Sequence, residues 1–135
     1  MTLHPSLPFQ NRRHLAPFYT PRSVAQALTD WAITGAKTTV LDPSFGGCAF
    51  LYASLETLHR KGSPAPATQI YGVDIDPEAR PYLEPLLSAG ARAEQFITAD
   101  FFDVSPDHFD GKPLDAVVGN PPYIRYHHIP DKARE

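Results

Sequence analysis

The segment GNPPYIRYHH, residues 119–128, holds the residue types in this sequence that are most suited to chemistry. Each of its two prolines lacks a backbone N–H and has φ fixed at about −65°, so neither can continue a strand or lie inside a helix. The chain must therefore leave any regular element at Asn120. We predict a stiff loop that holds the Asn120 amide, the two prolines and the ring of Tyr123 in fixed positions.

Three short apolar segments end in an aspartate, and a fourth leads into the proline loop. We expect strands over residues 38–42, 69–74, 94–100 and 114–119. Their alternation with helical segments predicts an α/β fold with a parallel sheet whose faces are covered. Ligands of such sheets bind beyond the carboxyl ends of the strands. The aspartates and the proline loop all lie at those ends.

The spacing of apolar residues predicts the helices between these strands. A helix is expected over residues 48–60 and an amphipathic helix over residues 21–33, with Trp31 in the core. Asp76 followed by Pro77 predicts the N-cap and first position of another helix. Two later prolines prevent that segment from being one long regular helix.

The first aspartate leads into a glycine-rich turn, LDPSFGGCAF. Pro43 ends the strand, and the pair Gly46 and Gly47 permits positive φ and a close approach of a ligand to the backbone. A helix then begins, and its free N–H groups point back at the turn. The turn has neither the GK[ST] of a phosphate loop nor a GxGxxG pattern. A binding loop and an ordinary strand-to-helix turn are both compatible with it.

The ends of the second and third strands offer groups that suit a nucleoside. Asp74 is placed to accept hydrogen bonds from ribose hydroxyls, as in dinucleotide folds, and Ile75 beside it can cover an adenine face. Asp100 can accept from an exocyclic amine, and Phe101 can pack on a base. The alternative for these last two is a solvated turn acid and a core phenylalanine. Together the strand ends predict a nucleoside site.

The composition limits the class of protein. The 135 residues suffice for one domain at most, and no stretch approaches the roughly 20 apolar residues of a membrane span. Cys48 is the only cysteine, which excludes an internal disulfide and fits a reducing compartment. We expect it to be a small buried side chain rather than a nucleophile. The net charge of −3 is not that of a protein that binds nucleic acid through bulk charge.

Several segments, taken in order, closely resemble the N6-adenine DNA methyltransferases of the gamma motif order, including those of restriction–modification systems. They are HLAPFYTPRSVAQALTDWA, VLDPSFGGCAFL, YGVDID, TADFF and VVGNPPYIRYHH. The resemblance covers nearly the whole chain from about Phe18. The NPPY motif alone is shared with protein-glutamine and some RNA methyltransferases. The segment Phe-Tyr-Thr-Pro before the glycine-rich turn is the feature that distinguishes the DNA methyltransferases from these enzymes. The resemblance implies a Rossmann-like class I fold that uses S-adenosylmethionine.

The resemblance also implies roles for single residues. Around the cofactor it places Thr20 at the carboxylate end, Asp42, Ser44 and Gly46 at the methionine part, Asp74 at the ribose, and Asp100 and Phe101 at the adenine. The Asn120 amide and the Pro121 carbonyl would accept both N6 hydrogens of the target adenine, so that the nitrogen lone pair becomes available. Pro122 would keep the loop rigid, and Tyr123 would stack on the base.

The implied partner is duplex DNA with a flipped adenine, with no membrane involved, and the implied location is the prokaryotic cytoplasm. Residues 1–17 are expected to form an N-terminal tail, and residues 18–135 the N-terminal part of the catalytic domain. The family's later strands and target-recognition domain are expected outside this chain, in the remaining part of the enzyme or with a restriction or specificity subunit. A phosphate-binding surface would lie there too, and this chain alone would be inactive.

Two alternatives stay open at this point. One is an enzyme that methylates protein glutamine or RNA, and the other is a remnant that binds the cofactor without turnover. No metal site is expected, because the adjacent His127 and His128 rarely converge on one ion. With Arg125 and Tyr126 they are interpreted as contacts near the nucleic acid or as a solvated surface turn.

Overall fold

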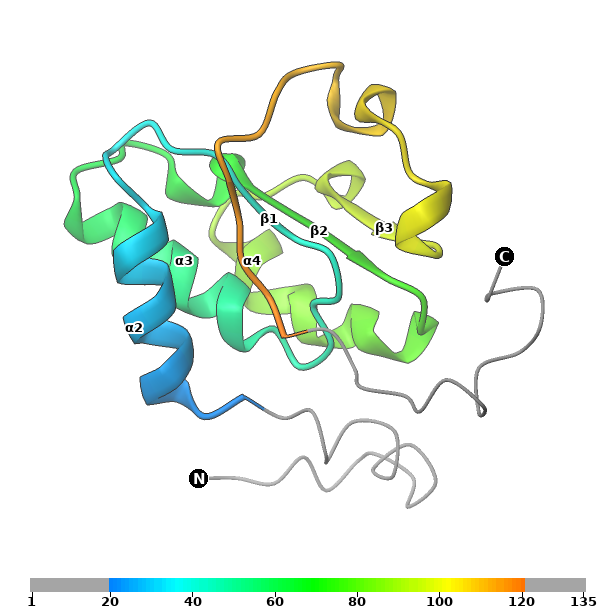
Figure 1. Ribbon diagram of the computed structural model, residues 1–135, viewed down its shortest axis with the longest axis horizontal. Helices are drawn as coiled ribbons and strands as arrows, with labels where there is room; N and C mark the ends of the chain where they lie inside the picture. Colours follow the sequence, from blue (N-terminus) through cyan, green and yellow to red (C-terminus); the bar gives the residue numbers. More distant parts are fainter. Residues whose placement is uncertain (1–19, 121–135) are drawn as a thin grey trace.

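The computed structural model describes residues 20–120, which form an α/β fold around one parallel sheet (Figure 1). The strands are β1 (Val40–Asp42), β2 (Ile70–Asp74), β3 (Phe96–Thr98) and β4 (Ala116–Val117). They lie in the order β3-β2-β1-β4, and every neighbouring pair is parallel. The predicted strands are confirmed, although each is shorter than its predicted range. At β3, for example, the 3₁₀ helix η4 (Ala93–Gln95) replaces the first predicted residues.

The helices also follow the predicted pattern. α2 (Arg22–Ala32) precedes β1, and α3 (Ala49–Arg60) connects β1 to β2. After β2 the Asp76 side chain accepts a hydrogen bond from Glu78 N (2.9 Å) and caps the 3₁₀ helix η3 (Pro77–Leu83), which continues into α4 (Glu84–Ser88). The remaining short 3₁₀ helices are η2 (Pro66–Gln69), η5 (Phe101–Asp103) and η6 (Pro106–Phe109). Within residues 20–120, no helix has the length and apolar character needed to cross a membrane.

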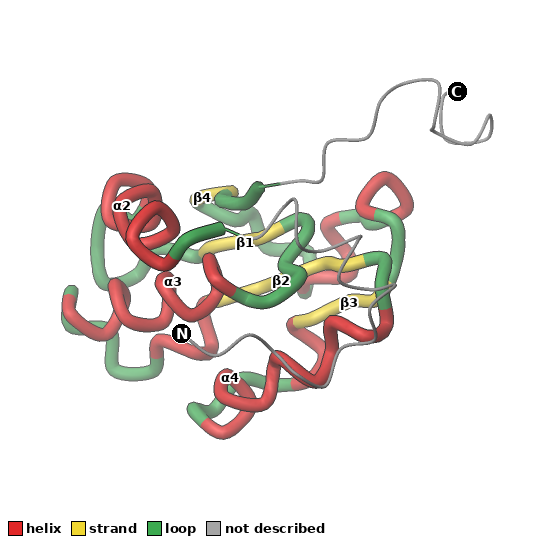
Figure 2. The backbone as a smooth tube through the Cα atoms, turned by 90° about the horizontal axis from the view of Figure 1, so that it is seen from below, coloured by secondary structure: helices red, strands yellow, loops and turns green. Residues whose placement is uncertain are grey.

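The two faces of the sheet bury different clusters, as the alternation of side chains along a strand requires. On one face, residues of α2, α3 and α4 pack against Val40, Ile70, Phe96 and Val118. Leu41, Tyr71, Val73 and Phe109 form the smaller cluster on the other face. Figure 2 shows β4 beside β1, at the edge of the sheet near α2.

Phe45 packs the turn after β1 against β2. A Cβ atom at Gly72 would lie 2.7 Å from Cδ1 of Phe45, so the ring passes directly over the glycine. The same ring meets Phe96 edge to face at 6.2 Å between centroids, and Phe45 N donates to the carbonyl of Val73 (3.1 Å). These contacts fix the position of the glycine-rich turn relative to the end of β2.

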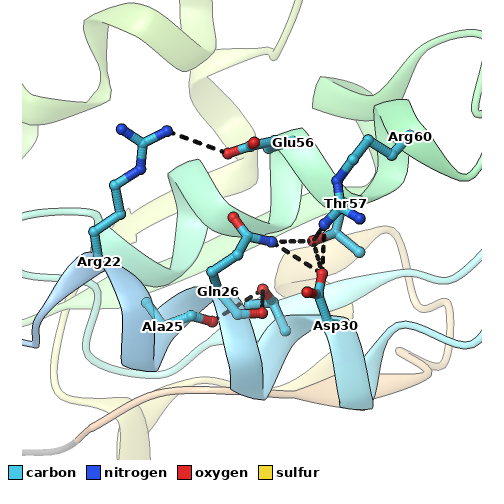
Figure 3. A network of polar contacts seen from close by, with 8 residues as sticks. Arg22, Ala25, Gln26, Asp30, Glu56, Thr57 and Arg60 are labelled. Atoms are coloured by element: carbon cyan, nitrogen blue, oxygen red, sulfur yellow. Dashed lines mark hydrogen bonds and ion pairs between the residues drawn. The ribbon is translucent and has the colours of Figure 1, made fainter.

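A polar network joins α2 to α3 (Figure 3). Gln26 Nε2 donates to Thr57 Oγ1 (2.7 Å), and that hydroxyl donates to Asp30 Oδ1 (2.9 Å). Arg60 forms an ion pair with the same carboxylate (2.5 Å) and lowers its pKa below the usual range. α2 therefore presents polar side chains to α3, while Ala25 and Thr29 face the core.

The prediction that Trp31 belongs to the core is wrong, because its side chain is 84% exposed. Trp31 lies on one helical stripe with Val24 and Leu28, which are also exposed. The buried side of α2 instead carries Ala25 and Thr29, whose side chains are fully buried. Helical periodicity identifies an apolar stripe, but it does not determine which face of the helix meets the rest of the protein.

Candidate functional site

The predicted site residues gather at the carboxyl ends of the strands. Asp42 and Asp74 are the last residues of β1 and β2, while Asp100 and Asn120 follow β3 and β4. Because all pairs of neighbouring strands are parallel, these ends lie along the same edge of the sheet (Figure 1).

Asp42 is a buried carboxylate at the centre of this edge, only 1% exposed. Its Oδ1 accepts a hydrogen bond from Ser44 N (2.9 Å). Burial raises the pKa of Asp42 to about 7, and the neighbouring Asp74 charge adds to the rise, whereas the Ser44 N–H opposes it. Within residues 20–120 no hydrogen bond reaches its other oxygen, Oδ2. As far as the described residues go, that oxygen can therefore accept from a ligand.

Asp74 ties three segments of the site together. Its Oδ2 accepts from Gly46 N (2.7 Å) in the turn after β1, and its Oδ1 accepts from Asp76 N (2.8 Å). Its backbone carbonyl accepts from Ala99 N (3.0 Å) beyond β3. Burial raises its pKa, although both N–H groups favour the charged form. Each carboxylate oxygen has a second lone pair that can accept one further hydrogen bond.

Two glycines permit this arrangement. Gly46 has a φ of +48°, the conformation predicted for the glycine-rich turn. At Gly119 a Cβ atom would lie 2.7 Å from Asp42 Oδ1 and 3.2 Å from Pro43 Cδ. β4 can therefore lead into the proline loop beside Asp42 only if residue 119 has no side chain. The sequence analysis missed this role of Gly119, and its place directly before NPPY was the available signal.

Thr20 and Asn120 come together although 100 residues separate them. Asn120 Nδ2 donates to Thr20 Oγ1 at 3.3 Å. Thr20 is buried just before α2, whereas Asn120 is exposed at the end of the described chain. The start of α2 and the segment after β4 thus form one side of the site.

Apolar side chains stand exposed beside the acids. Ile75 is 68% exposed, and Phe101 is 41% exposed. Phe101 is therefore not the core residue that the alternative interpretation required. Phe102, which the sequence analysis passed over, is 91% exposed and contacts the Phe101 ring at 6.4 Å between centroids. Asp100 accepts a hydrogen bond from Phe102 N (3.0 Å) and so caps η5 while it stays partly exposed.

The remaining predicted residues divide into two groups. Cys48 is fully buried and burial raises the pKa of its thiol, which confirms the interpretation as a buried side chain. Outside the described residues lie the predicted loop members Pro121, Pro122 and Tyr123, together with residues 125–128. Among residues 20–120, no group of three or more His, Cys, Asp or Glu side chains is arranged to hold a metal ion.

Comparison with curated proteins identifies two similar type II methyltransferases. Type II methyltransferase M.XamI of Xanthomonas campestris pv. amaranthicola is 30% identical over 123 residues, which are 86% of this chain and 22% of that protein. Type II methyltransferase M.AccI of Acinetobacter calcoaceticus is 24% identical over 132 residues, which are 94% of this chain and 22% of that protein. The chain thus spans 22% of the length of each of these relatives.

A solved structure supports the fold. The type I restriction-modification system methyltransferase subunit from Streptococcus thermophilus superposes with a TM-score of 0.57 at 24% identity, over 78% of this chain and 23% of that one. The predicted Rossmann-like class I methyltransferase fold is confirmed. The model of the family described as N-6 DNA Methylase matches residues 9–134, a range that contains the glycine-rich turn, the acids at the strand ends and the proline loop. This chain belongs to the N-6 DNA Methylase family.

Proposed function

We propose that this chain is part of a DNA methyltransferase that transfers a methyl group from S-adenosylmethionine to N6 of adenine in DNA, within a restriction–modification or related system. The observation that carries the proposal is the convergence of Asp42, Asp74 and Asn120 at one sheet edge, in a chain of this family. Both named relatives are type II methyltransferases, and the similar solved structure is a methyltransferase subunit of a type I restriction-modification system.

The free acceptors of the site fit the cofactor. Oδ2 of buried Asp42, to which residues 20–120 donate no hydrogen bond, suits the ammonium group of the methionine part, since a buried carboxylate oxygen calls for a donor or a cation. Gly46 leaves space for close approach to the backbone of the turn, where Ser44 also lies. Thr20 has a hydroxyl that can donate to a carboxylate.

The nucleoside part of the cofactor suits the ends of β2 and β3. Asp74 keeps one acceptor position on each oxygen for the two ribose hydroxyls. Ile75 and Phe101 supply exposed apolar surface for the adenine, and Asp100 supplies a carboxylate for its exocyclic amine. When bound, S-adenosylmethionine supplies an electrophilic methyl group on a positively charged sulfur.

The proline loop would act on the target base. The lone pair of an adenine amino group is delocalised into the ring, which makes the nitrogen a poor nucleophile. The Asn120 amide oxygen and the Pro121 carbonyl would accept the two N6 hydrogens and so localise the lone pair for in-line attack on the methyl carbon. The rigid prolines Pro121 and Pro122 keep these acceptors preorganised, and Tyr123 would stack on a base flipped out of the duplex.

The proposal extends to the larger organisation of the enzyme. We assign residues 1–17 to an N-terminal tail and residues 18–135 to the N-terminal part of the catalytic domain. Further strands and the region that reads the DNA sequence would belong to the remaining part of the enzyme or to a specificity subunit. Since its substrate would be DNA in a prokaryotic cell, we place the enzyme in the cytoplasm.

The proposed function is tested by replacing Asn120 with alanine in the complete natural enzyme. Asn120→Ala should lower methyl transfer to adenine-containing duplex DNA on the order of 10²–10³-fold, the usual cost of one preorganised polar contact. Affinity for S-adenosylmethionine should stay near that of the wild type, because the other loops provide most of its contacts. Labelled methyl transfer and calorimetry measure the two quantities.

Thr68→Ala is a suitable control, because Thr68 lies exposed in η2, away from the strand carboxyl ends. Near-normal turnover of Asn120→Ala would contradict the assigned role. Transfer of label by the wild type to a glutamine peptide or to RNA instead of DNA would replace the proposed substrate. Cofactor binding without transfer to any of these substrates would identify a non-catalytic protein.

A further inference from the structure

The contact between Thr20 and Asn120 links the two parts of the site that the proposed function keeps separate. Thr20 is assigned to the cofactor and Asn120 to the target base, yet Asn120 Nδ2 lies 3.3 Å from Thr20 Oγ1. Within residues 20–120 this is the one hydrogen bond that either side chain makes. Thr20 is only 8% exposed, so its hydroxyl is a fixed point against which the exposed amide can be oriented.

We propose that Thr20 is a positioning residue that fixes which end of the Asn120 amide faces the target base. The proposal rests on the proposed function and concerns the orientation of one side chain within it. With Nδ2 bound to Thr20 Oγ1, the amide oxygen is the end to which no residue of 20–120 donates. Only that end can accept a hydrogen from adenine N6, because a flipped amide would direct N–H against N–H.

A threonine hydroxyl can serve both parts of the site at once. It has one donor and two acceptor lone pairs. It can accept from Asn120 while it donates its own hydrogen to the carboxylate of the bound cofactor. Hydrogen bonds in such a chain polarise and strengthen one another, so cofactor binding would tighten the hold of Thr20 on Asn120.

The length of the contact agrees with this coupling. The 3.3 Å separation is longer than the usual separation of about 2.9–3.0 Å for an N–H···O hydrogen bond. Catalytic hydrogen bonds are often long in a protein without its ligands and shorten in the complex. We therefore expect the Thr20–Asn120 hydrogen bond to shorten when the cofactor carboxylate binds.

The first test needs no activity. The side-chain ¹⁵N–H resonances of Asn120, assigned by their loss in Asn120→Asp, are compared between the wild type, Thr20→Val and Thr20→Ser without cofactor. Thr20→Val should move the bonded proton upfield and accelerate its exchange with water, whereas Thr20→Ser keeps the hydroxyl and should resemble the wild type. Unchanged resonances in Thr20→Val would overturn the proposal. Thermal melting identifies a misfolded variant, in which case Thr20→Ala replaces Thr20→Val.

The second test separates positioning from cofactor binding. At saturating S-adenosylmethionine, Thr20→Val should still show kcat for DNA methylation lowered roughly three- to tenfold, the worth of one neutral hydrogen bond, and Thr20→Ser should restore it. A defect that vanishes at saturation would mean that Thr20 serves the cofactor alone, and would overturn the proposal. If the wild type methylates no DNA, the proposed function fails, while the resonances of Asn120 still decide whether Thr20 orients its amide.

Discussion

Two buried aspartates at the ends of adjacent strands have different surroundings. Asp74 accepts from a backbone N–H at each oxygen, Gly46 N at one and Asp76 N at the other. Among the residues that the structure describes, Asp42 accepts at one oxygen only, from Ser44 N, and it is the more deeply buried of the two. Asp74 thus positions the turn around it, whereas one oxygen of Asp42 receives no hydrogen bond from the described part of the chain.

Replacement of Asp74 tests its assignment to the ribose. Asp74→Ala should weaken S-adenosylmethionine binding by roughly 1.5–3 kcal/mol, because charged hydrogen bonds to the ribose hydroxyls are lost. Asp76→Ala is the matched control, since Asp76 caps η3 and has no assigned cofactor contact. Calorimetry on variants whose thermal melting shows them to be folded measures the affinities. Equal affinity in Asp74→Ala and the wild type would refute the assignment.

The buried carboxyl of Asp42 predicts a pH dependence of stability. Its folded-state pKa of about 7 lies above the ordinary value of 3.8, so the folded protein retains a proton that the unfolded chain releases. The free energy of unfolding should therefore fall as the pH rises from about 4 to about 7, and this group should add no further change above that range. Asp42→Asn should flatten the dependence, as measured by urea unfolding at pH 5 and pH 8. A slope equal to that of the wild type would contradict the prediction.

At the scale of the elements, close backbone packing sets the positions of the turns. Phe45 covers Gly72 and places the glycine-rich turn on β2, while Gly119 lets the segment after β4 pass beside Asp42. α2 is held to α3 by the network around Thr57 and brings Thr20 to Asn120. The site is therefore assembled by strand ends and one helix start that lie far apart in the sequence.

A matched pair of glycine substitutions tests this packing. In Gly72→Ala the new Cβ would lie 2.7 Å from the Phe45 ring, whereas Gly35→Ala meets nothing within 4 Å. Gly72→Ala should lower the free energy of unfolding by about 1–3 kcal/mol, the cost of overpacking a core, and Gly35→Ala should change it by less than about 0.5 kcal/mol. Denaturant unfolding measures both. Similar losses in the two variants would show that the Phe45 contact is not the cause.

At the scale of the whole molecule, net charge and length are the two quantities that bear on what we expect the chain to do by itself. Its net charge of −3 provides little of the counterion release that drives protein–DNA affinity. The relatives that it matches are several times longer, since the chain spans 22% of each. The cofactor contacts that we propose lie within the chain, whereas we expect most of the DNA surface to belong to the remaining part of the enzyme.

The isolated 135-residue chain is therefore expected to bind S-adenosylmethionine without methylating DNA. Equilibrium dialysis with the labelled cofactor should show saturable binding, and incubation with plasmid DNA should leave no label in the DNA. Its affinity for duplex DNA should stay in the weak non-specific range at physiological salt. Efficient methylation by the chain alone would refute this expectation.

The sequence by itself determined the α/β class, the order of strands and helices and the family. Runs of apolar residues that end in Asp42 and Asp74 indicate buried strands, each with a polar residue at its end. This pattern is local, and so it can be read from the sequence. Asp76 as a helix cap and Cys48 as a buried side chain follow from similarly local rules.

The tertiary structure decided which faces and side chains meet. The stripe that contains Trp31 was visible in the sequence, but its exposure depends on α2 meeting α3 through the polar side chains of Gln26 and Asp30. The steric need for Gly119 and the contact of Thr20 with Asn120 arise only when segments far apart in the sequence are packed together. Periodicity describes one element at a time, whereas these features depend on distances between elements, which only the packed sheet and its helices fix.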